Sequence, residues 1–240
     1  MLVEVCANSL QSGLNAEKAG ADRIELCSEL GVGGITPSFG LLKSTREQLS
    51  LPVHVLIRPR SGDFTYSDLE FDTMKNDILL CVELGFAGVV SGVLNSDFTL
   101  DVDRTKELRQ LARPLKFTFH RAFDWVKDPF AALAQLEEMG VDYILSSGQQ
   151  RSALQGIKLL DQLHRTNPRC AIMPGGGIKE ENAREFMKRG FKALHLTGTK
   201  FHKKLDKKPE VPMNSMRFLE EDEIAVSDVK NIQNVIKGVK

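Results

Sequence analysis

The 240-residue sequence predicts a single (β/α)8 barrel of the TIM type, and three features of the chain support this fold class. Four segments share one pattern, in which a helix end is followed by a glycine and then by a short β-rich run. Three further apolar runs each begin with a proline, which is tolerated at the first position of a strand. The stretches between the runs place apolar residues at helical spacing. Strands therefore alternate with helices, and eight such units close into a barrel, whereas an open doubly wound sheet usually has about five or six strands.

The expected strands can be assigned in chain order. The first is LVEVC, and the repeated pattern then gives KAGADRIELC, ELGFAGVVSG, EMGVDYILSSG and KRGFKALHLTG. The glycines of the pattern, which suit the left-handed position that ends a helix, are Gly20, Gly85, Gly140 and Gly190. The strands that begin with a proline are PVHVLI, PLKFTF and PRCAIM. An irregular charged segment, residues 199–224, precedes a last helix expected over Ala225–Lys237. No linker indicates a second domain, so we expect residues 1–240 to form one domain.

The composition excludes several classes of protein. Lysine plus arginine equals aspartate plus glutamate, 32 each, so no overall basic field would attract nucleic acid or an acidic membrane. No apolar run is long enough to cross a bilayer, and Met1 leads directly into LVEVC without a secretory signal. The four cysteines lie far apart, which argues against a disulfide framework or a zinc ribbon. We therefore expect a cytoplasmic protein with reduced thiols that binds neither nucleic acid nor membranes.

The ends of the first two strands each carry a glutamate and a cysteine. Catalytic residues of such barrels lie at the carboxyl ends of the strands. Side chains alternate along a strand, so Glu4 points the same way as Cys6, and Glu25 the same way as Cys27. We expect both pairs to face the interior, because a charged side chain facing the helices would meet an apolar wall. Two thiols on neighbouring strands can share one soft ion such as Cu(I); the alternative is that both cysteines are buried small hydrophobic residues.

Basic residues follow the third, fifth and eighth strands. They are Arg58, Arg60, His120, Arg121 and His195. The arginines can pair with the two glutamates as a structural network, or they can clamp an anionic substrate. In the second case His120, Glu4 or Glu25 would carry a proton, with His195 as a further acid or base. In FTFHRAFDW, we expect Phe117 and Phe119 to fill the barrel, and His120 with Arg121 to mark its opening.

Two loops on the same side suit a phosphate group. The sixth strand ends in SSGQ, which includes Ser147, and the seventh ends in PGGG, which includes Gly175, Gly176 and Gly177. Glycine lets backbone N–H groups approach an anion, and the loops after strands seven and eight often hold phosphate in this fold. The alternative is a tight strand-to-helix turn that merely requires glycine.

Several blocks of the sequence together resemble the CutC family, which is associated with copper homeostasis. They are VEVCANS, GADRIELCSEL, GGITPSFG, IRPRSGDFTYSD, GVVSGVL, FTFHRAFDWVKDP, SSGQ and IMPGGGI. The resemblance implies a cytoplasmic TIM-type barrel, often a homodimer, with Cu(I) bound by Cys6 and Cys27. Ser61 and the segment LHLTGT depart from the family pattern, and VPMNSMRF keeps only part of the pattern expected of a closing lid or subunit contact.

Two functions therefore follow from the sequence. The first is a copper-homeostasis protein that binds Cu(I) at the mouth of the barrel. The second is an enzyme that acts on a small anionic substrate, such as a phosphorylated one, by acid/base chemistry. The expected partners are thus a copper ion, a small anion, or both, and no organic cofactor is implied.

Overall fold

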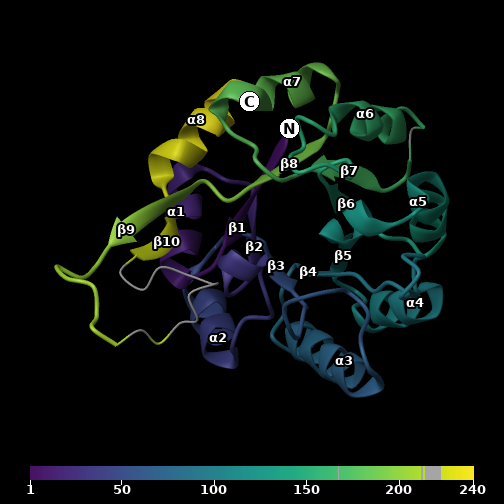
Figure 1. Cartoon of the computed structure of the whole chain (residues 1–240), viewed down its shortest axis with the longest axis horizontal. Coiled ribbons are helices and arrows are strands. Elements are labelled where there is room, and N and C mark those ends of the chain that lie inside the picture. The colour runs from purple at the N-terminus through teal and green to yellow at the C-terminus, as the bar shows by residue number, and fades with distance from the viewer. Residues whose placement is uncertain (167, 212, 214–222) are drawn as a thin grey trace.

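The computed structural model describes residues 1–166, 168–211, 213 and 223–240, and its centre is an eight-stranded parallel sheet curled into a barrel (Figure 1). The strands are β1 (Leu2–Ala7), β2 (Arg23–Leu26), β3 (Val53–Leu56), β4 (Gly88–Ser91), β5 (Lys116–Phe119), β6 (Tyr143–Ser146), β7 (Ala171–Pro174) and β8 (Ala193–Leu196). Neighbours in the sheet follow the order β7-β6-β5-β4-β3-β2-β1-β8. A parallel bridge between Gly175 and His195 joins the ends of β7 and β8, so the barrel is nearly closed. The predicted fold class is confirmed.

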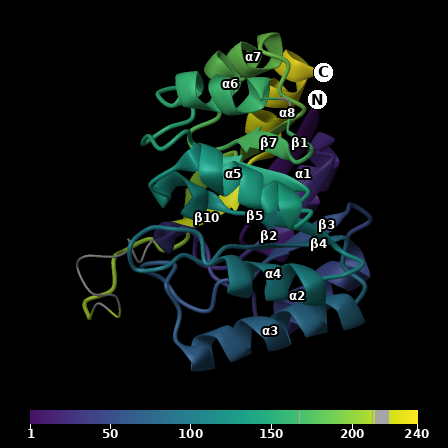
Figure 2. The same cartoon turned by 90° about the vertical axis from the view of Figure 1, so that its right-hand side faces the viewer.

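Helices alternate with the strands and surround them (Figures 1 and 2). They are α1 (Leu10–Ala19), α2 (Phe39–Gln48), α3 (Asp68–Glu83), α4 (Val102–Leu111), α5 (Pro129–Glu138), α6 (Ile157–Arg165), α7 (Glu180–Lys188) and α8 (Val229–Val239). Two 3-10 helices, η1 (Leu30–Val32) and η2 (Arg121–Trp125), lie in the loops after β2 and β5. None of the helices in the described residues is both long and apolar enough to span a bilayer.

Local sequence signals set the ends of the helices. Ser67 and Glu70 form a capping box at the start of α3, and Asp128 caps α5, whose first residue is a proline. The four glycines of the repeat all have positive φ, between 70° and 84°, directly after a helix or its last capping residue. Their predicted left-handed conformation is confirmed, and each one turns the chain from a helix into the next strand.

The two faces of the barrel wall differ in polarity. Outward side chains such as Val3, Ile24 and Phe117 belong to the large apolar cluster that packs against the helices. Phe117 and Phe119 were expected to fill the barrel, but this expectation is wrong, because strand alternation places Thr118 inside, where its hydroxyl lies 3.5 Å from His54 Nδ1. The apolar core therefore lies between strands and helices, and polar side chains fill much of the barrel itself.

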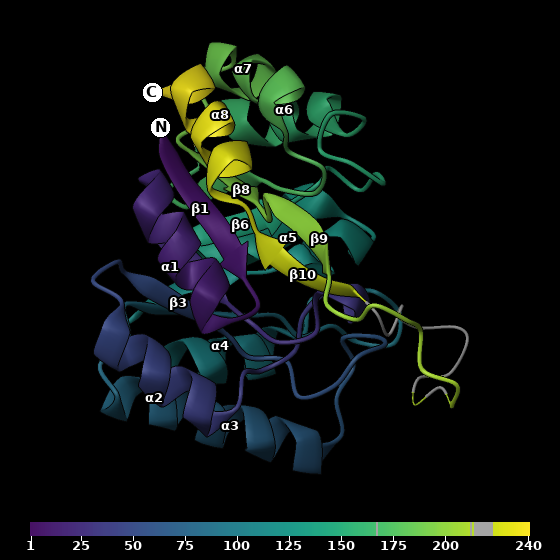
Figure 3. The ribbon, with the colours of Figure 1, turned by 90° about the vertical axis from the view of Figure 1, so that its left-hand side faces the viewer.

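The C-terminal segment is more regular than the sequence suggested. Strands β9 (Thr199–Lys203) and β10 (Glu223–Ser227) pair antiparallel, so the two ends of this segment are strands of one hairpin rather than irregular chain (Figure 3). Helix α8 starts four residues later than expected. Ser227 at the end of β10 donates a hydrogen bond to the carbonyl of Cys6. Residues 212 and 214–222, which include most of VPMNSMRF, lie outside the described residues.

Candidate functional site

A cavity of about 760 Å³ opens at the carboxyl ends of the strands. The chemically active side chains that line it are Cys6, Glu25, Arg58, His120, Arg121 and His195. The backbone of Gly176 and Gly177 lines the same cavity, as do residues at the start of α7 and in α8. The strand ends that the sequence singled out thus meet at one place.

Cys6 and Cys27 lie together at the floor of the cavity. Their sulfur atoms are 3.5 Å apart, and both side chains are buried. Parallel pairing of β1 with β2 brings them together, since Cys27 N–H donates to the carbonyl of Ala7, the residue after Cys6. Cys6 lines the cavity, whereas Cys27 lies beneath it, fully buried and covered by Gly34.

A charged network fills the barrel below the thiols. Arg23 Nε donates to Glu4 Oε2 at 2.5 Å, and His195 Nδ1 lies 2.8 Å from Glu4 Oε1. The Arg23 guanidinium also stacks 4.0 Å from the centre of the Tyr143 ring across the barrel. The sequence offered Arg58, Arg60 and Arg121 as partners of the buried glutamates. For Glu4 the structure corrects this, because the ion pair is formed by Arg23, which lies on the same strand and face as Glu25 and is paired with Glu4 in the sheet.

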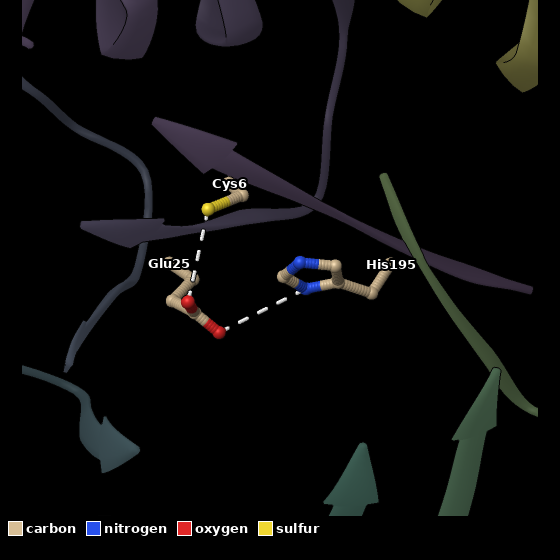
Figure 4. A group of neighbouring side chains, drawn as sticks. All are labelled: Cys6, Glu25 and His195. Carbon is tan, nitrogen blue, oxygen red and sulfur yellow. Dashed lines mark hydrogen bonds and ion pairs between the residues drawn. The ribbon is translucent and has the colours of Figure 1, made fainter. Parts of the chain in front are cut away.

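Glu25 lies between Cys6 and His195 (Figure 4). Cys6 Sγ is 3.7 Å from Glu25 Oε1, and Glu25 Oε2 is 3.9 Å from His195 Nδ1. Oε2 is buried and forms no hydrogen bond with any residue that the structure describes. Glu25 is thus less satisfied than Glu4, although both come from the interior face of the same two strands.

The difference in surroundings separates the acidities of the two carboxyl groups. Burial favours the neutral form of Glu4, but Arg23 and His195 outweigh this and lower its pKa to about 2. Burial raises the pKa of Glu25 to about 7, with Glu4 adding to the effect and His195 opposing it. Burial would lower the pKa of His195, but Glu25 and Glu4 raise it above its usual value. The hydrogen bond with Cys27 and burial raise the pKa of the Cys6 thiol well above its usual value.

Arg58 lines the cavity but is largely committed to the backbone around it. Its guanidinium donates to the carbonyls of Val32, Gly34 and Gly62, each at 2.8 Å. It also lies 5.1 Å from the centre of the Phe64 ring. Arg58 therefore fixes the loops at the mouth, and only its Nε lacks a partner among the described residues.

The other two predicted arginines differ in position. Arg60 does not line the cavity, because its guanidinium binds Glu70, Asp63 and the carbonyl of Thr65 at the surface. Arg121 does line it, and it donates to Asp124 and to the hydroxyl of Ser147 at 2.8 Å each. Of the two, only Arg121 can contact a ligand in the cavity.

His120 lies beside the cavity as a neutral imidazole. Its Nδ1 accepts a hydrogen bond from the Ala122 N–H, and its ring packs 4.8 Å from the Phe64 ring, centre to centre. Nε2 is buried and has no hydrogen-bond partner in the described part of the chain. Burial and the charge of Arg58 lower the pKa of His120 to about 3. Because Nδ1 accepts the hydrogen bond from Ala122, the neutral ring carries its proton on Nε2, which can donate a hydrogen bond to a ligand but carries no charge near neutral pH.

The glycine loop is only partly open to the cavity. Gly175 faces Leu145 and His195 and does not line it, whereas Gly176 and Gly177, with φ of 97° and 74°, do. Ser147 is buried outside the cavity and bonds to Asp124 and to the carbonyl of Gln150. Gly175 and Ser147 thus act on the shape of the loop rather than at the surface a ligand would touch.

Two residues of this region were missed by the sequence reasoning. Arg23 sits two positions before Glu25, so strand alternation alone would have placed it inside the barrel. Asp124 lies in FTFHRAFDW and accepts hydrogen bonds from Ser146, Ser147 and Gln149, which fixes the loop after β6. Its role in fixing this loop carried no sequence signal, since the three residues of the loop that donate to it are more than twenty positions away.

Comparisons with known proteins agree on one family. The model of the CutC family matches residues 1–200. A family protein called CutC from Salmonella typhimurium is 45% identical over 194 residues, which cover 81% of this chain and 78% of that protein. A crystal structure of CutC from Streptococcus agalactiae, which carries the name copper homeostasis protein, is 36% identical with a TM-score of 0.78 and covers 82% of this chain and 98% of that one. A thiamine phosphate pyrophosphorylase from Pyrococcus furiosus is 14% identical with a TM-score of 0.58 and covers 99% of this chain and 95% of that one. At this identity the likeness concerns the fold only.

Proposed function

The chain belongs to the CutC family, and from this premise we propose that it serves copper homeostasis by binding Cu(I) at the mouth of the barrel. The ligands in this proposal are Cys6 and Cys27. The observation that carries it is the pair of buried sulfur atoms, 3.5 Å apart, at the floor of the cavity. Soft thiolate ligands select Cu(I), and two of them from neighbouring strands can hold one ion.

The surroundings of the thiols determine how copper would bind. The hydrogen bond with Cys27, burial and the carboxylates of Glu25 and Glu4 favour the protonated form of Cys6. A metal ion brings its own positive charge to this acidic region and replaces the thiol protons. Uptake of Cu(I) therefore releases protons, and the affinity for Cu(I) should fall as the pH is lowered.

The test is an anaerobic competition titration with a Cu(I) chelator. The native chain should bind one equivalent of Cu(I) tightly, and Cys6→Ser and Cys27→Ser should abolish this binding. Cys81→Ser is the matched control, because Cys81 is equally buried but packs in the apolar core around the barrel. Unchanged Cu(I) binding in both Cys6→Ser and Cys27→Ser would remove the proposal.

A second candidate function is an enzyme that acts on a small anionic substrate, such as a phosphorylated one. A cavity of about 760 Å³ is far larger than one ion needs and is of the size that small molecules occupy. Glu25, with a pKa of about 7, suits a general acid or base near neutral pH, and Arg121 with the Gly176 and Gly177 backbone offers donors to an anion.

A thermal-shift screen of phosphorylated and carboxylated metabolites tests this second function. A true ligand raises the melting temperature of the native chain, because it binds only the folded state. Arg121→Leu should remove the shift, and Arg60→Leu should retain it, since Arg60 lies outside the cavity. A screen without any hit that depends on Arg121 would count against the enzyme.

The family also supports two proposals about the setting of the protein. We infer that it is a homodimer in the cytoplasm. Sedimentation equilibrium would measure its mass against the 26.7 kDa of one chain, and fractionation of the source cells would locate it.

A further inference from the structure

We propose that Cys6, Glu25 and His195 form a binding site for a divalent ion of the zinc type, with a ligand set that differs from the proposed Cu(I) pair. One potential ligand atom from each of the three residues lies within 4.8 Å of the other two, and all three residues are buried. They come from three adjacent strands, β2, β1 and β8, so the barrel itself holds them together. Figure 4 shows the Glu25 carboxylate between the sulfur and the imidazole.

The chemistry of the donors suits Zn²⁺ better than Cu(I). The three residues supply one sulfur, one oxygen and one nitrogen, all of which are ordinary ligands of Zn²⁺. A carboxylate oxygen is a hard ligand that a soft Cu(I) ion disfavours. Catalytic zinc sites use three protein ligands and leave a fourth position open, and this set has that number.

His195 is already oriented as a metal ligand. Its Nδ1 lies 2.8 Å from Glu4 Oε1, which leaves Nε2 as the ring nitrogen available to an ion. Arg23 holds Glu4 from the other side, so the carboxylate cannot turn away from the imidazole. A histidine whose second nitrogen binds a carboxylate is the usual arrangement at zinc sites, where it fixes the ring and raises its basicity.

Glu25 Oε2 is the independent observation that points to a ligand. This buried oxygen forms no hydrogen bond within the described residues and lies 3.9 Å from His195 Nδ1, the ring nitrogen that also contacts Glu4. A buried carboxylate oxygen without a hydrogen bond is costly, and a bound cation would satisfy it. Ligand atoms around a tetrahedral ion are about 3.3–3.8 Å apart given its bond lengths, so side chains whose candidate ligand atoms lie within 4.8 Å of one another would need to draw together by about 1 Å.

The open side of this site faces the cavity. Cys6, Glu25 and His195 all line it, whereas Cys27 does not. A bound ion would thus present its fourth position to the cavity, where a water molecule or a small ligand with an oxygen donor can reach it. The inference goes beyond Cu(I) binding, because it gives the cavity a metal centre accessible to a small molecule.

The two metal sites share Cys6, and the variants that remove them differ. Cys27 belongs only to the Cu(I) pair, and Glu25 only to the divalent site. Zn²⁺ and Cu(I) would therefore exclude one another, but Cys27→Ser and Glu25→Gln should each weaken only one of the two metals. This allows the inference and the proposed function to fail separately.

The experiment uses the whole metal-free chain, with Zn²⁺ in competition with a chromophoric chelator and Co²⁺ as a spectroscopic probe. The native chain should bind one equivalent of each, and Co²⁺ should show a thiolate charge-transfer band and the intense visible bands of a tetrahedral ion. Glu25→Gln should weaken Zn²⁺ binding by about 10- to 100-fold or more, because a ligand matters at least as much as a residue that only hydrogen-bonds to a ligand. Cys27→Ser should leave the Zn²⁺ affinity within about threefold, as should Glu181→Gln, a carboxylate that lines the cavity outside the triad.

Three results would overturn the inference. They are the absence of a thiolate band in the native chain with Co²⁺, an unchanged Zn²⁺ affinity in Glu25→Gln, and an equal loss of Zn²⁺ in Cys27→Ser. The Co²⁺ spectrum is measured on the native chain, so it tests whether a thiolate binds the divalent ion even where a variant fails to fold. Cu(I) binding that persists while Zn²⁺ binding is absent would leave the proposed function intact.

Discussion

The interior of this barrel contains a buried ion pair between Arg23 and Glu4. Both side chains are almost fully shielded from water, and removal of one partner leaves the other as an uncompensated charge in a medium of low polarity. Such pairs are costly to break although they contribute little net stability compared with apolar residues. The energetic role of Arg23 is therefore to offset the cost of burying the Glu4 carboxylate, which in turn holds the imidazole of His195.

We expect Arg23→Met to lower the free energy of unfolding by about 3–5 kcal/mol, because Glu4 then stays buried with only His195 beside it. Urea denaturation measures the change. Glu4→Gln combined with Arg23→Met should recover much of the loss. Arg165→Met, which removes an exposed ion pair with Asp161, should cost less than about 1 kcal/mol. A loss from Arg23→Met no larger than that control would contradict the role assigned to the pair.

His54 predicts a specific dependence of stability on pH. Burial and the charge of Arg23 lower its pKa from 6.5 to about 4 in the folded chain. As the pH falls below about 6.5, the unfolded chain takes up a proton at this imidazole and the folded chain does not. The contribution of His54 to the free energy of unfolding is therefore fully present above that pH and is lost as the pH falls toward 4. The decline from this group amounts to about 3 kcal/mol at most.

The comparison of native chain with His54→Asn isolates that contribution. Denaturation midpoints are measured from pH 7 to about pH 4 in both proteins, and other titrating groups cancel in the difference. The variant should lose less stability on acidification than the native chain. Parallel curves for the two proteins would show that His54 does not titrate in this way.

The strand ends show how far residue-level patterns reach. Alternation along each strand placed Glu4, Cys6 and Glu25 inside the barrel, and the structure has them there. The partner of Glu4 was not predicted, because the sequence alone does not distinguish among the basic residues near the strand ends. The register of β1 with β2 places Arg23 directly beside Glu4. Which of several compatible charges meet is decided by register, and register is a property of the folded sheet.

At the scale of elements, the loop after β2 protects the thiol pair. Gly34 lies directly over Cys27, and a Cβ added there would be 2.7 Å from Leu56 Cδ2 and 3.3 Å from Cys27 Cβ. Gly33 has the same φ of 87°, but its nearest neighbour would be Arg58 Nη1 at 3.5 Å. The two glycines thus share a backbone requirement and differ in what they cover.

Gly34→Ala and Gly33→Ala therefore form a matched pair. Both should lose about 1–3 kcal/mol of stability from the left-handed backbone, and Gly34→Ala should lose more because its methyl group displaces Leu56 and Cys27. Gly34→Ala should also weaken Cu(I) binding, while Gly33→Ala should not. The check is a chelator titration of both proteins beside their unfolding curves. Equal Cu(I) affinities would mean that the loop does not control the position of Cys27.

The elements divide sharply into those that local signals determine and those that they do not. The glycine after each helix was visible in the sequence because its left-handed conformation is a requirement of one residue. The β9–β10 hairpin was not visible, because its two strands are twenty residues apart and its charged sequence lacks alternation. Strand pairing over such a distance is fixed by tertiary contacts, here by β10 against α1 and the end of β1.

At the scale of the whole molecule, α8 completes the ring of helices. It packs between α1 and α7, and Ile232, Val235 and Val239 are buried in the common apolar core. The family model ends at residue 200, before this helix begins. The structure indicates that the residues beyond the match still support the first and last strands of the barrel.

A chain truncated after residue 200 should therefore fail to fold as a cooperative unit. Loss of α8 would expose apolar surface on α1 and α7 and leave the contact of β1 with β8 without its outer cover. Near-ultraviolet circular dichroism and dye binding to exposed apolar surface would detect this against the full chain. A truncated protein with a native spectrum and a single sharp melting transition would show that the C-terminal helix is dispensable.

Glu4 and His195 touch although 191 positions separate them along the chain. On the ribosome the first strand is made about 10–40 s before the last, at ordinary rates of synthesis. Throughout that interval the nascent chain carries the thiols of Cys6 and Cys27 without His195, whose imidazole completes their surroundings. The thiols of Cys6 and Cys27 become buried only when the chain folds around them, so oxidants and competing metals reach them more easily before folding than after it.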